Sequence, residues 1–323
     1  MVATIGGVSV TDRSVPATGL EARDLRFRTR VRLGQCLYLL GLSKYLLPAF
    51  VPKPGPLRRR MLAYLEHYLA SVRSADSVLL LKPLDAQFAV DLIDHMLQPF
   101  LRERGEIYEI AEIRHICANV MADDHILDIG ANHGFWGVAV ARAAGLSAKL
   151  HLFEANPVLV LRLRKTLLLN RQIDARLHGI AVGDGTSESI SFFRPQGNLS
   201  GLGSTVLHDY ANGQGYLRAD DQIRVATRSI DQLMDAGEIT GMDVVKIDVE
   251  HAEDAVIDGA KRAIDRFKPR LLMVETGVDS RATSTLLAAG YSMTALGVDG
   301  REFTAPLGYW GNLLFRRPAP RVD

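Results

Sequence analysis

The chain contains few of the features that mark specialised classes of protein. Only Cys36 and Cys117 are cysteines, and they stand too far apart to build a disulfide framework or a four-ligand zinc site. A reducing, cytoplasmic location fits this composition. An overall charge of one sign is also missing, because 38 lysine and arginine residues face 37 aspartate and glutamate residues. The net charge of +1 gives no general attraction to nucleic acid, so we expect no nucleic-acid partner.

Long hydrophobic runs are absent as well. The most apolar early stretch, residues 36–51, is interrupted by Lys44 and Pro48 and is shorter than the roughly 20 apolar residues of a membrane-spanning helix. The first ten residues lack a basic leader, which argues against a secretory signal. With 47% hydrophobic and 23% charged residues, the 323-residue chain has the composition of a folded protein of one large or two modest domains.

The charge is distributed unevenly along the chain. The first 60 residues carry 11 basic and 3 acidic side chains, whereas the remainder carries 27 basic and 34 acidic ones. We interpret residues 1–56 as a basic N-terminal arm that ends in the PKPGP stretch. The favoured interpretation is a helix that packs on the main domain or on a partner. The alternative is peripheral contact with an anionic membrane surface on the cytoplasmic side.

Residues 57–120 show apolar side chains at near-helical spacing. This pattern predicts a helical lead-in of two to four helices, either a cap over the active site or the surface of a homo-oligomer. Glu109 and Glu112 lie at its end. We favour their interpretation as charges on a helix surface, with a position at the mouth of a pocket as the alternative.

From residue 121 to residue 323, short β-rich runs alternate with helical ones. This alternation predicts an α/β domain with a doubly wound, mainly parallel sheet. In such sheets the ligand binds outside the carboxyl ends of the strands. The residues that follow each strand are therefore the candidate functional residues.

Three successive strands are expected to end in acidic residues. The first delivers Asp128 and a glycine-rich turn, where a carboxylate suits a cationic ligand group, such as an amino group, better than a phosphate. The second ends at Glu154, 24 residues after Gly130, a distance at which an acid commonly binds ribose hydroxyls. The third ends at Asp184, where an adenine edge is expected. Each acid alone also fits a helix cap.

The motifs DIGANHG (128–134), FEANP (153–157), AVGD (181–184) and above all KIDVEHAE (246–253) resemble those of the FkbM-type S-adenosylmethionine-dependent methyltransferases. The resemblance covers about half of the chain. It implies a class I, Rossmann-like methyltransferase fold with a seven-stranded sheet whose antiparallel final strand is supplied by residues 310–316. It also implies O-methylation of a hydroxyl, often on a sugar, a glycan or a polyketide-like product.

The resemblance also implies roles for particular residues. Asp248, Glu250 and His251 are expected to line the transfer site, where a carboxylate or the histidine takes the proton of the hydroxyl. His251 and His133 depart from the family pattern, which commonly has glycine and an apolar residue at these positions. The residues expected to hold the S-adenosylmethionine cofactor are Asp128, Gly130, Asn132, Gly134, Glu154 and Asp184.

Two further features concern the metal and the acceptor. In a strand, Glu253 would face the side opposite to Asp248 and Glu250, which argues against one ion shared by all three, so we expect no metal ligands and leave a metal requirement open. Lys246 is interpreted as the ion-pair partner of Asp248. The glycine-rich loop of residues 194–221 is interpreted as a lid that contacts the acceptor through Asn198, Ser204 and Thr205, with an irregular surface loop as the alternative.

The favoured interpretation is an O-methyltransferase acting on a small molecule or glycan with a free hydroxyl. One alternative is an NAD-dependent oxidoreductase on a similar sheet, against which Asp128 and the KIDVE strand argue. The other is a non-catalytic scaffold that keeps the cofactor pocket.

Overall fold

The computed structural model describes residues 77–81, 84, 86–90, 109–145, 147–194, 203–205 and 222–317. The basic arm, the greater part of the lead-in, Asn198 and most of the glycine-rich loop lie outside these ranges. The predictions made for them therefore stay predictions, as do the proposed domain boundaries.

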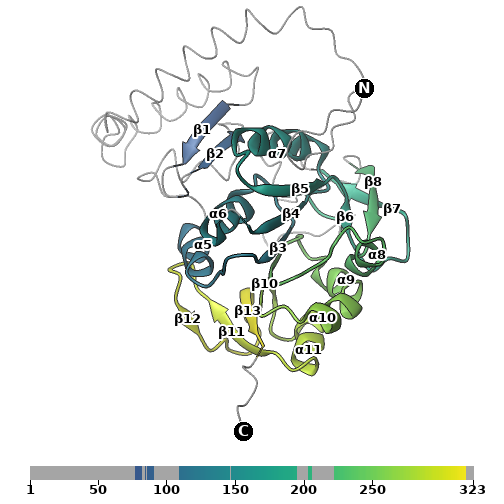
Figure 1. Ribbon diagram of the computed structural model, residues 1–323. Coiled ribbons are helices and arrows are strands. Elements are labelled where there is room, and N and C mark those ends of the chain that lie inside the picture. The colour runs from purple at the N-terminus through teal and green to yellow at the C-terminus, as the bar shows by residue number, and fades with distance from the viewer. Residues whose placement is uncertain are drawn as a thin grey trace, which may run out of the picture.

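A mixed sheet of eight strands forms the centre of the described structure, in the order β12-β11-β13-β10-β9-β3-β4-β5 (Figure 1). The strands β5, β4, β3, β9 and β10 are parallel neighbours, and β13 runs antiparallel between β10 and β11. Their bounds are β3 His125–Ile129, β4 Lys149–Phe153, β5 Asp174–His178, β9 Val244–Ile247, β10 Leu271–Gly277, β11 Ser292–Leu296, β12 Glu302–Phe303 and β13 Trp310–Arg316.

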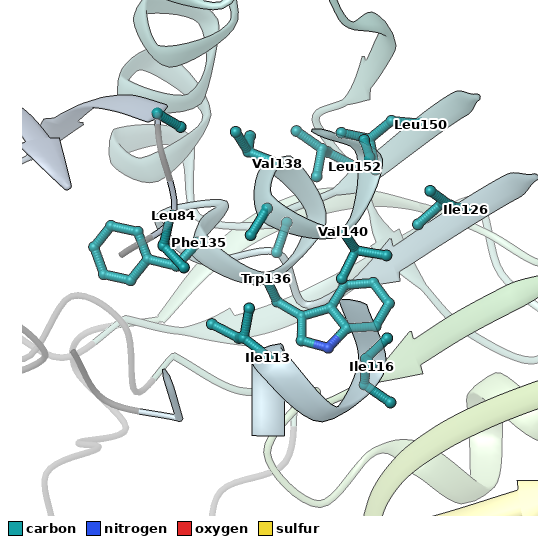
Figure 2. Packing of buried hydrophobic residues seen from close by; sticks show 14 of the residues in the cluster. Leu84, Ile113, Ile116, Ile126, Phe135, Trp136, Val138, Val140, Leu150 and Leu152 are labelled. Atoms are coloured by element: carbon teal, nitrogen blue, oxygen red, sulfur yellow. The ribbon is translucent and has the colours of Figure 1, made fainter. Parts of the chain in front are cut away.

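Helices cover both faces of this sheet, as the alternating pattern predicts (Figure 1). The first face packs against α5 (Ile110–Cys117), α6 (Phe135–Ala144) and α7 (Pro157–Leu169). On this face Trp136 of α6 is directed toward Ile113 and Ile116 of α5 (Figure 2). The second face packs against α8 (Ile230–Asp235), α9 (Glu253–Asp258), α10 (Lys261–Phe267) and α11 (Arg281–Ala288).

The core strands are buried on both faces, and successive residues alternate between the two hydrophobic clusters. Ile126 and Val244 belong to the first cluster, whereas Leu127 and Val245 belong to the second. This alternation is the period of two of a β-strand, and it explains why the strands read as continuous apolar runs. The FEANP motif begins α7, because the Asn156 side chain accepts a hydrogen bond from the backbone N–H of Val158 and Pro157 occupies the first turn.

The sheet differs from the expected one in its strand count. The two-residue strand β12 adds an eighth strand at the edge, beyond the seven of the expected fold. The antiparallel strand predicted at residues 310–316 is confirmed as β13. The third strand, which was expected to end at Asp184, is divided into β5 and β6 (Ala181–Val182). Strand β6 leaves the main sheet and pairs with β8 (Gln222–Arg228), which also pairs with β7 (Ser189–Phe193).

The prediction of an all-helical lead-in is wrong for part of its length. Strands β1 (Ser77–Leu81) and β2 (Ala86–Val90) form an antiparallel hairpin, while α5 confirms a helix at the end of the segment. Strand β2 packs on α7, where the backbone N–H of Ala89 donates to Thr166 Oγ1 over 3.0 Å. Short apolar runs fit helix and strand alike, and here this distant helix stabilises the extended form.

Candidate active site

The register of the sheet places charged side chains in adjacent positions on its first face. Asp128 of β3 lies beside Lys246 of β9, and Lys246 lies beside Met273 of β10. Two residues further along, where the strands end, come Asp248 after β9 and Glu275 on β10, with Asn312 of β13 opposite Glu275. The carboxyl ends of the parallel strands β3, β9 and β10, together with the start of the antiparallel β13, therefore present one polar row, which is the candidate site.

A tight turn after β3 forms one side of this site. Gly130, Asn132 and Gly134 have φ values of 84°, 52° and 80°, all in the left-handed region. No other residue fits at position 130, because an added Cβ would lie 1.7 Å from the backbone oxygen of Asp248. The glycine thus brings the turn after β3 against the end of β9, where the predicted cofactor-binding and catalytic residues meet.

Asp128 is almost fully buried beneath this turn, with 1% of its surface exposed. Its Oδ2 accepts a hydrogen bond of 2.9 Å from the backbone N–H of Gly137 in α6. Its Oδ1 has no hydrogen-bond partner among the described residues. Burial raises the pKa of the carboxyl to about 6. One oxygen therefore holds the helix in place, and the other remains available for a ligand donor.

Glu154 follows β4 and lies on the other side of the same turn. It accepts backbone hydrogen bonds from Asn132 (2.8 Å, to Oε2) and from Asn156 (2.7 Å, to Oε1). Burial raises its pKa to about 7 despite these two donors. A carboxylate accepts up to about four hydrogen bonds, so Glu154 keeps capacity for a pair of ligand hydroxyls.

Asp184 does not lie with these residues. Because β6 leaves the main sheet, Asp184 is exposed, and its Oδ1 accepts hydrogen bonds from the backbone and hydroxyl of Thr186. Its Cα would lie 3.0 Å from a Cβ at Gly259, which follows the last turn of α9. The expected position of Asp184 at the end of a third sheet strand is therefore wrong, and its carboxylate closes a turn.

The end of β9 holds a buried cation between carboxylates. Lys246 Nζ lies 3.0 Å from Asp248 Oδ2 and 3.2 Å from Glu109 Oε2. The predicted ion pair with Asp248 is confirmed. Glu109 was expected on a helix surface, but only 13% of its side chain is exposed and it precedes α5 with a left-handed φ of 58°. Together these carboxylates raise the pKa of Lys246 well above its ordinary value, so it remains charged.

Glu275 is the site residue that sequence reasoning missed. The register that pairs Val274 with Ile247 places Glu275 beside Asp248. The negative charge of Asp248 together with burial raises the pKa of Glu275 to about 10. A signal was present in the sequence, since Glu275 ends an apolar strand as Asp128 and Asp248 do. Its significance depended on β10 being the neighbour of β9.

The segment after Asp248 is held in an unusual conformation. Glu250 and His251 have φ values of 55° and 74°, and Glu253 Oε1 accepts hydrogen bonds from the backbone N–H groups of Val249 (3.1 Å) and His251 (3.2 Å). Ser204 donates its hydroxyl to the backbone oxygen of Glu250. Glu253 therefore shapes this loop rather than facing a ligand, and burial raises its pKa to about 7.

The histidines and the loop residues lie in different surroundings. The ring centroids of His251 and the half-exposed Trp310 lie 4.8 Å apart, and Trp310 packs over Gly277. His133 is buried away from solvent and stacks on Phe135, with 5.4 Å between the two ring centroids. Ser204 is buried beside Glu250, and Thr205 follows it with partial exposure.

Two kinds of feature are absent from the described part of the chain. No group of three His, Cys, Asp or Glu side chains there is arranged to hold a metal ion. Within the same ranges, no helix has the length and apolar character needed to cross a bilayer.

Comparison with known proteins identifies the family. The methyltransferase FkbM domain matches residues 128–293, which is more than half of the chain. The chain belongs to the FkbM methyltransferase family. The matched region of this FkbM protein begins at Asp128 and includes the part of the polar row that lies on β3, β9 and β10.

One curated relative is the hexuronic acid methyltransferase AglP of Haloferax volcanii. It is 28% identical to this FkbM protein over 178 residues, which are 54% of the chain and 66% of AglP, just under two thirds of that relative. Solved structures with a similar chain path include the O-methyltransferase TomG of Streptomyces achromogenes in complex with SAM (14% identity, 79% of this chain and 96% of TomG, TM-score 0.39) and M. jannaschii TYW2 in complex with AdoMet (13% identity, 76% and 88%, TM-score 0.39).

Proposed function

We propose that this FkbM protein uses S-adenosylmethionine to methylate a hydroxyl group of a saccharide, with a uronic acid-containing glycan as the first candidate acceptor. The observation that carries the proposal is the juxtaposition, within a matched methyltransferase domain, of the acidic turn at Asp128 and Glu154 with the carboxylates at the end of β9. The relative AglP, named for its action on a hexuronic acid, supports the saccharide class.

The donor set fits this cofactor. The free Oδ1 of Asp128 suits the ammonium group of the methionine part, because a buried carboxylate is stabilised by an opposite charge. Glu154 suits a ribose diol, which donates two parallel hydrogen bonds. A dinucleotide fits less well, because Asp128 already occupies the N–H of Gly137 near the start of α6 and the surrounding carboxylates repel a pyrophosphate.

In this proposal, residues at the end of β9 take up the proton that the acceptor hydroxyl loses. When bound, S-adenosylmethionine supplies a methyl group already activated as a sulfonium. A sugar hydroxyl has a pKa near that of water, roughly 15–16, so its proton must leave as the new C–O bond forms. Asp248 is the carboxylate at the junction of the two halves of the site, and Lys246 holds it ionised at 3.0 Å. We assign Asp248 as the proton acceptor.

Other side chains have positioning roles in this proposal. Ser204 and Glu253 fix the left-handed turn that contains Glu250 and His251. Trp310, with 48% of its surface exposed, offers an aromatic face beside His251, which suits the C–H face of a sugar ring. Holding both partners in line lowers the entropic part of the barrier.

Calorimetry with S-adenosylhomocysteine tests the cofactor assignment. Glu154→Ala should weaken binding at least tenfold, or about 1.4 kcal/mol. Asp174→Ala, which removes an exposed acid at the opposite end of neighbouring strand β5, should leave the affinity unchanged. No binding by folded wild-type protein would overturn the proposed cofactor. NAD measured in parallel separates the oxidoreductase alternative.

Transfer of a labelled methyl group to a panel of glycosides tests the acceptor class. We expect a methyl ether on a uronic acid glycoside and a loss of at least 100-fold in Asp248→Asn, consistent with the usual contribution of a general base. Transfer to nitrogen or carbon acceptors alone would contradict O-methylation. Cofactor binding without transfer to any glycoside of the panel would contradict the saccharide assignment and favour the scaffold alternative.

A further inference from the structure

Five ionisable side chains from separate parts of the chain converge in the interior of the site. Lys246 lies between Glu109, which precedes α5, and Asp248, which follows β9. Asp128 of β3 is beside Lys246 in the sheet register, and Glu275 of β10 contacts Asp248. The single ammonium group of this cluster therefore faces four carboxyl groups, all of them largely removed from water.

The contact between Asp248 and Glu275 requires a proton. The register that pairs Val274 with Ile247 places Glu275 beside Asp248, and the ammonium group of Lys246 lies 3.0 Å from Asp248. An ionised carboxylate only accepts hydrogen bonds, so the two carboxyl groups can bond to each other only when they hold at least one proton between them. Two neighbouring carboxyl groups in a buried site cannot both stay ionised, because the negative charge of each disfavours the ionised form of the other.

The neighbours of the pair decide which member carries the proton. Asp248 lies 3.0 Å from Lys246, and this contact stabilises its charge. Glu275 faces the charges of Asp248 and Glu250, with Lys246 acting on it more weakly. The environment therefore favours an ionised Asp248 and a protonated Glu275 that donates to it.

We propose that Asp248 and Glu275 form a carboxyl pair with one shared proton, in which Glu275 is a positioning residue that orients the ionised Asp248 toward the acceptor hydroxyl. The role of the pair in transfer rests on the proposed function. In the step, the acceptor O–H bond breaks as the oxygen gains the methyl group, and the hydroxyl proton passes to Asp248. The pair then holds two protons and releases one to solvent to restore its starting state.

Infrared difference spectroscopy of the full chain tests the shared proton without any acceptor. At about pH 8.5 the carboxyl groups of Asp128, Glu154 and Glu253 are mostly ionised, whereas Glu275 keeps its proton. We expect the carbonyl band of a protonated carboxylic acid in wild-type protein and its disappearance in Glu275→Gln. Glu302→Gln, in which the lost carboxyl is bound to Arg316 and has a lowered pKa, should leave the band unchanged. A wild-type spectrum without the band, or a band that survives in Glu275→Gln, would overturn the proposal.

The variant Asp248→Asn tests whether the band belongs to a pair. Removing the charge of Asp248 removes the largest cause of the raised pKa of Glu275. The band should then titrate away at a pH at least one unit lower than in wild-type protein. An unchanged titration would show that burial alone holds the proton and would contradict the pair.

Rescue by a neutral donor tests the positioning role. The amide of Glu275→Gln can still donate to Asp248, whereas Glu275→Leu cannot. With the glycoside panel, we expect Glu275→Gln to keep kcat within about threefold of wild type. We expect Glu275→Leu to lose at least tenfold in kcat with unchanged S-adenosylhomocysteine affinity. Equal loss in Glu275→Gln and Glu275→Leu would refute the role. An intact band in wild-type protein that transfers no methyl group would contradict the proposed function and leave the shared proton established.

Discussion

Replacing Lys246 by methionine removes the only cation among the five converging side chains. The ammonium group lies 3.0 Å from Asp248 and 3.2 Å from Glu109, and 7% of the lysine side chain is exposed. At an effective dielectric constant of about 20, charges this close attract by roughly 5 kcal/mol per contact. Methionine loses both attractions but also avoids the cost of burying the ammonium. Removing one partner of a buried ion pair typically costs about 3–5 kcal/mol, and we expect a loss in that range at about pH 8.

The cost should depend on pH in a defined direction. Without the cation, burial and the neighbouring Glu275 carboxyl raise the folded-state pKa of Asp248 above its unfolded-state value. A group of this kind stabilises the folded state at low pH and loses that contribution as the pH rises through its folded-state pKa. The penalty of Lys246→Met should therefore shrink by at least half when the pH falls from about 8 to about 5.

Urea denaturation followed by the fluorescence of the buried Trp136 measures both quantities. Lys261→Met is the matched control, because Lys261 also pairs with an aspartate, Asp258 at 2.7 Å, but has 55% of its side chain exposed. The control should cost less than about 1 kcal/mol at either pH. A penalty below about 1 kcal/mol for Lys246→Met at pH 8, or one that grows toward pH 5, would refute the reasoning.

Two further predictions concern the turn after β3. Gly130→Ala should cost at least about 3 kcal/mol of unfolding free energy, because its Cβ meets the Asp248 backbone 1.7 Å away in a left-handed conformation. Gly237→Ala, at φ 70° with nothing within 4 Å, should cost only about 1 kcal/mol, and equal thermal shifts for the two would contradict the steric argument. Glu154 has its pKa raised from 4.5 to about 7, so its contribution to stability is present below about pH 4.5 and is lost as the pH rises through 7. The difference in unfolding free energy between wild-type protein and Glu154→Gln should therefore fall by up to about 3 kcal/mol between pH 4.5 and 8 in urea titrations, and a difference independent of pH would be inconsistent with the raised pKa.

The doubly wound domain and the turn around Asp128 follow from local features of the sequence. Its strands are continuous apolar runs, and the residues that follow parallel strands meet at one edge whatever the details of packing. Asp128, Gly130 and Glu154 are therefore brought together by adjacent strands, and the ion pair of Lys246 with Asp248 follows from their spacing of two residues. These features depend on local periodicity and on neighbouring segments.

Other features depend on contacts between segments that are far apart in the chain, and they appear only in the tertiary structure. The hairpin β1–β2 is extended because it packs on α7. Asp184 does not follow a strand of the main sheet, because β6 belongs to a separate sheet. Glu109 and Glu275 stand 137 and 27 residues from Lys246 and Asp248, respectively, and no short-range pattern connects them. Their carboxyl groups acquire their partners from burial beside one another, which is a property of the packed interior and not of the residues taken singly.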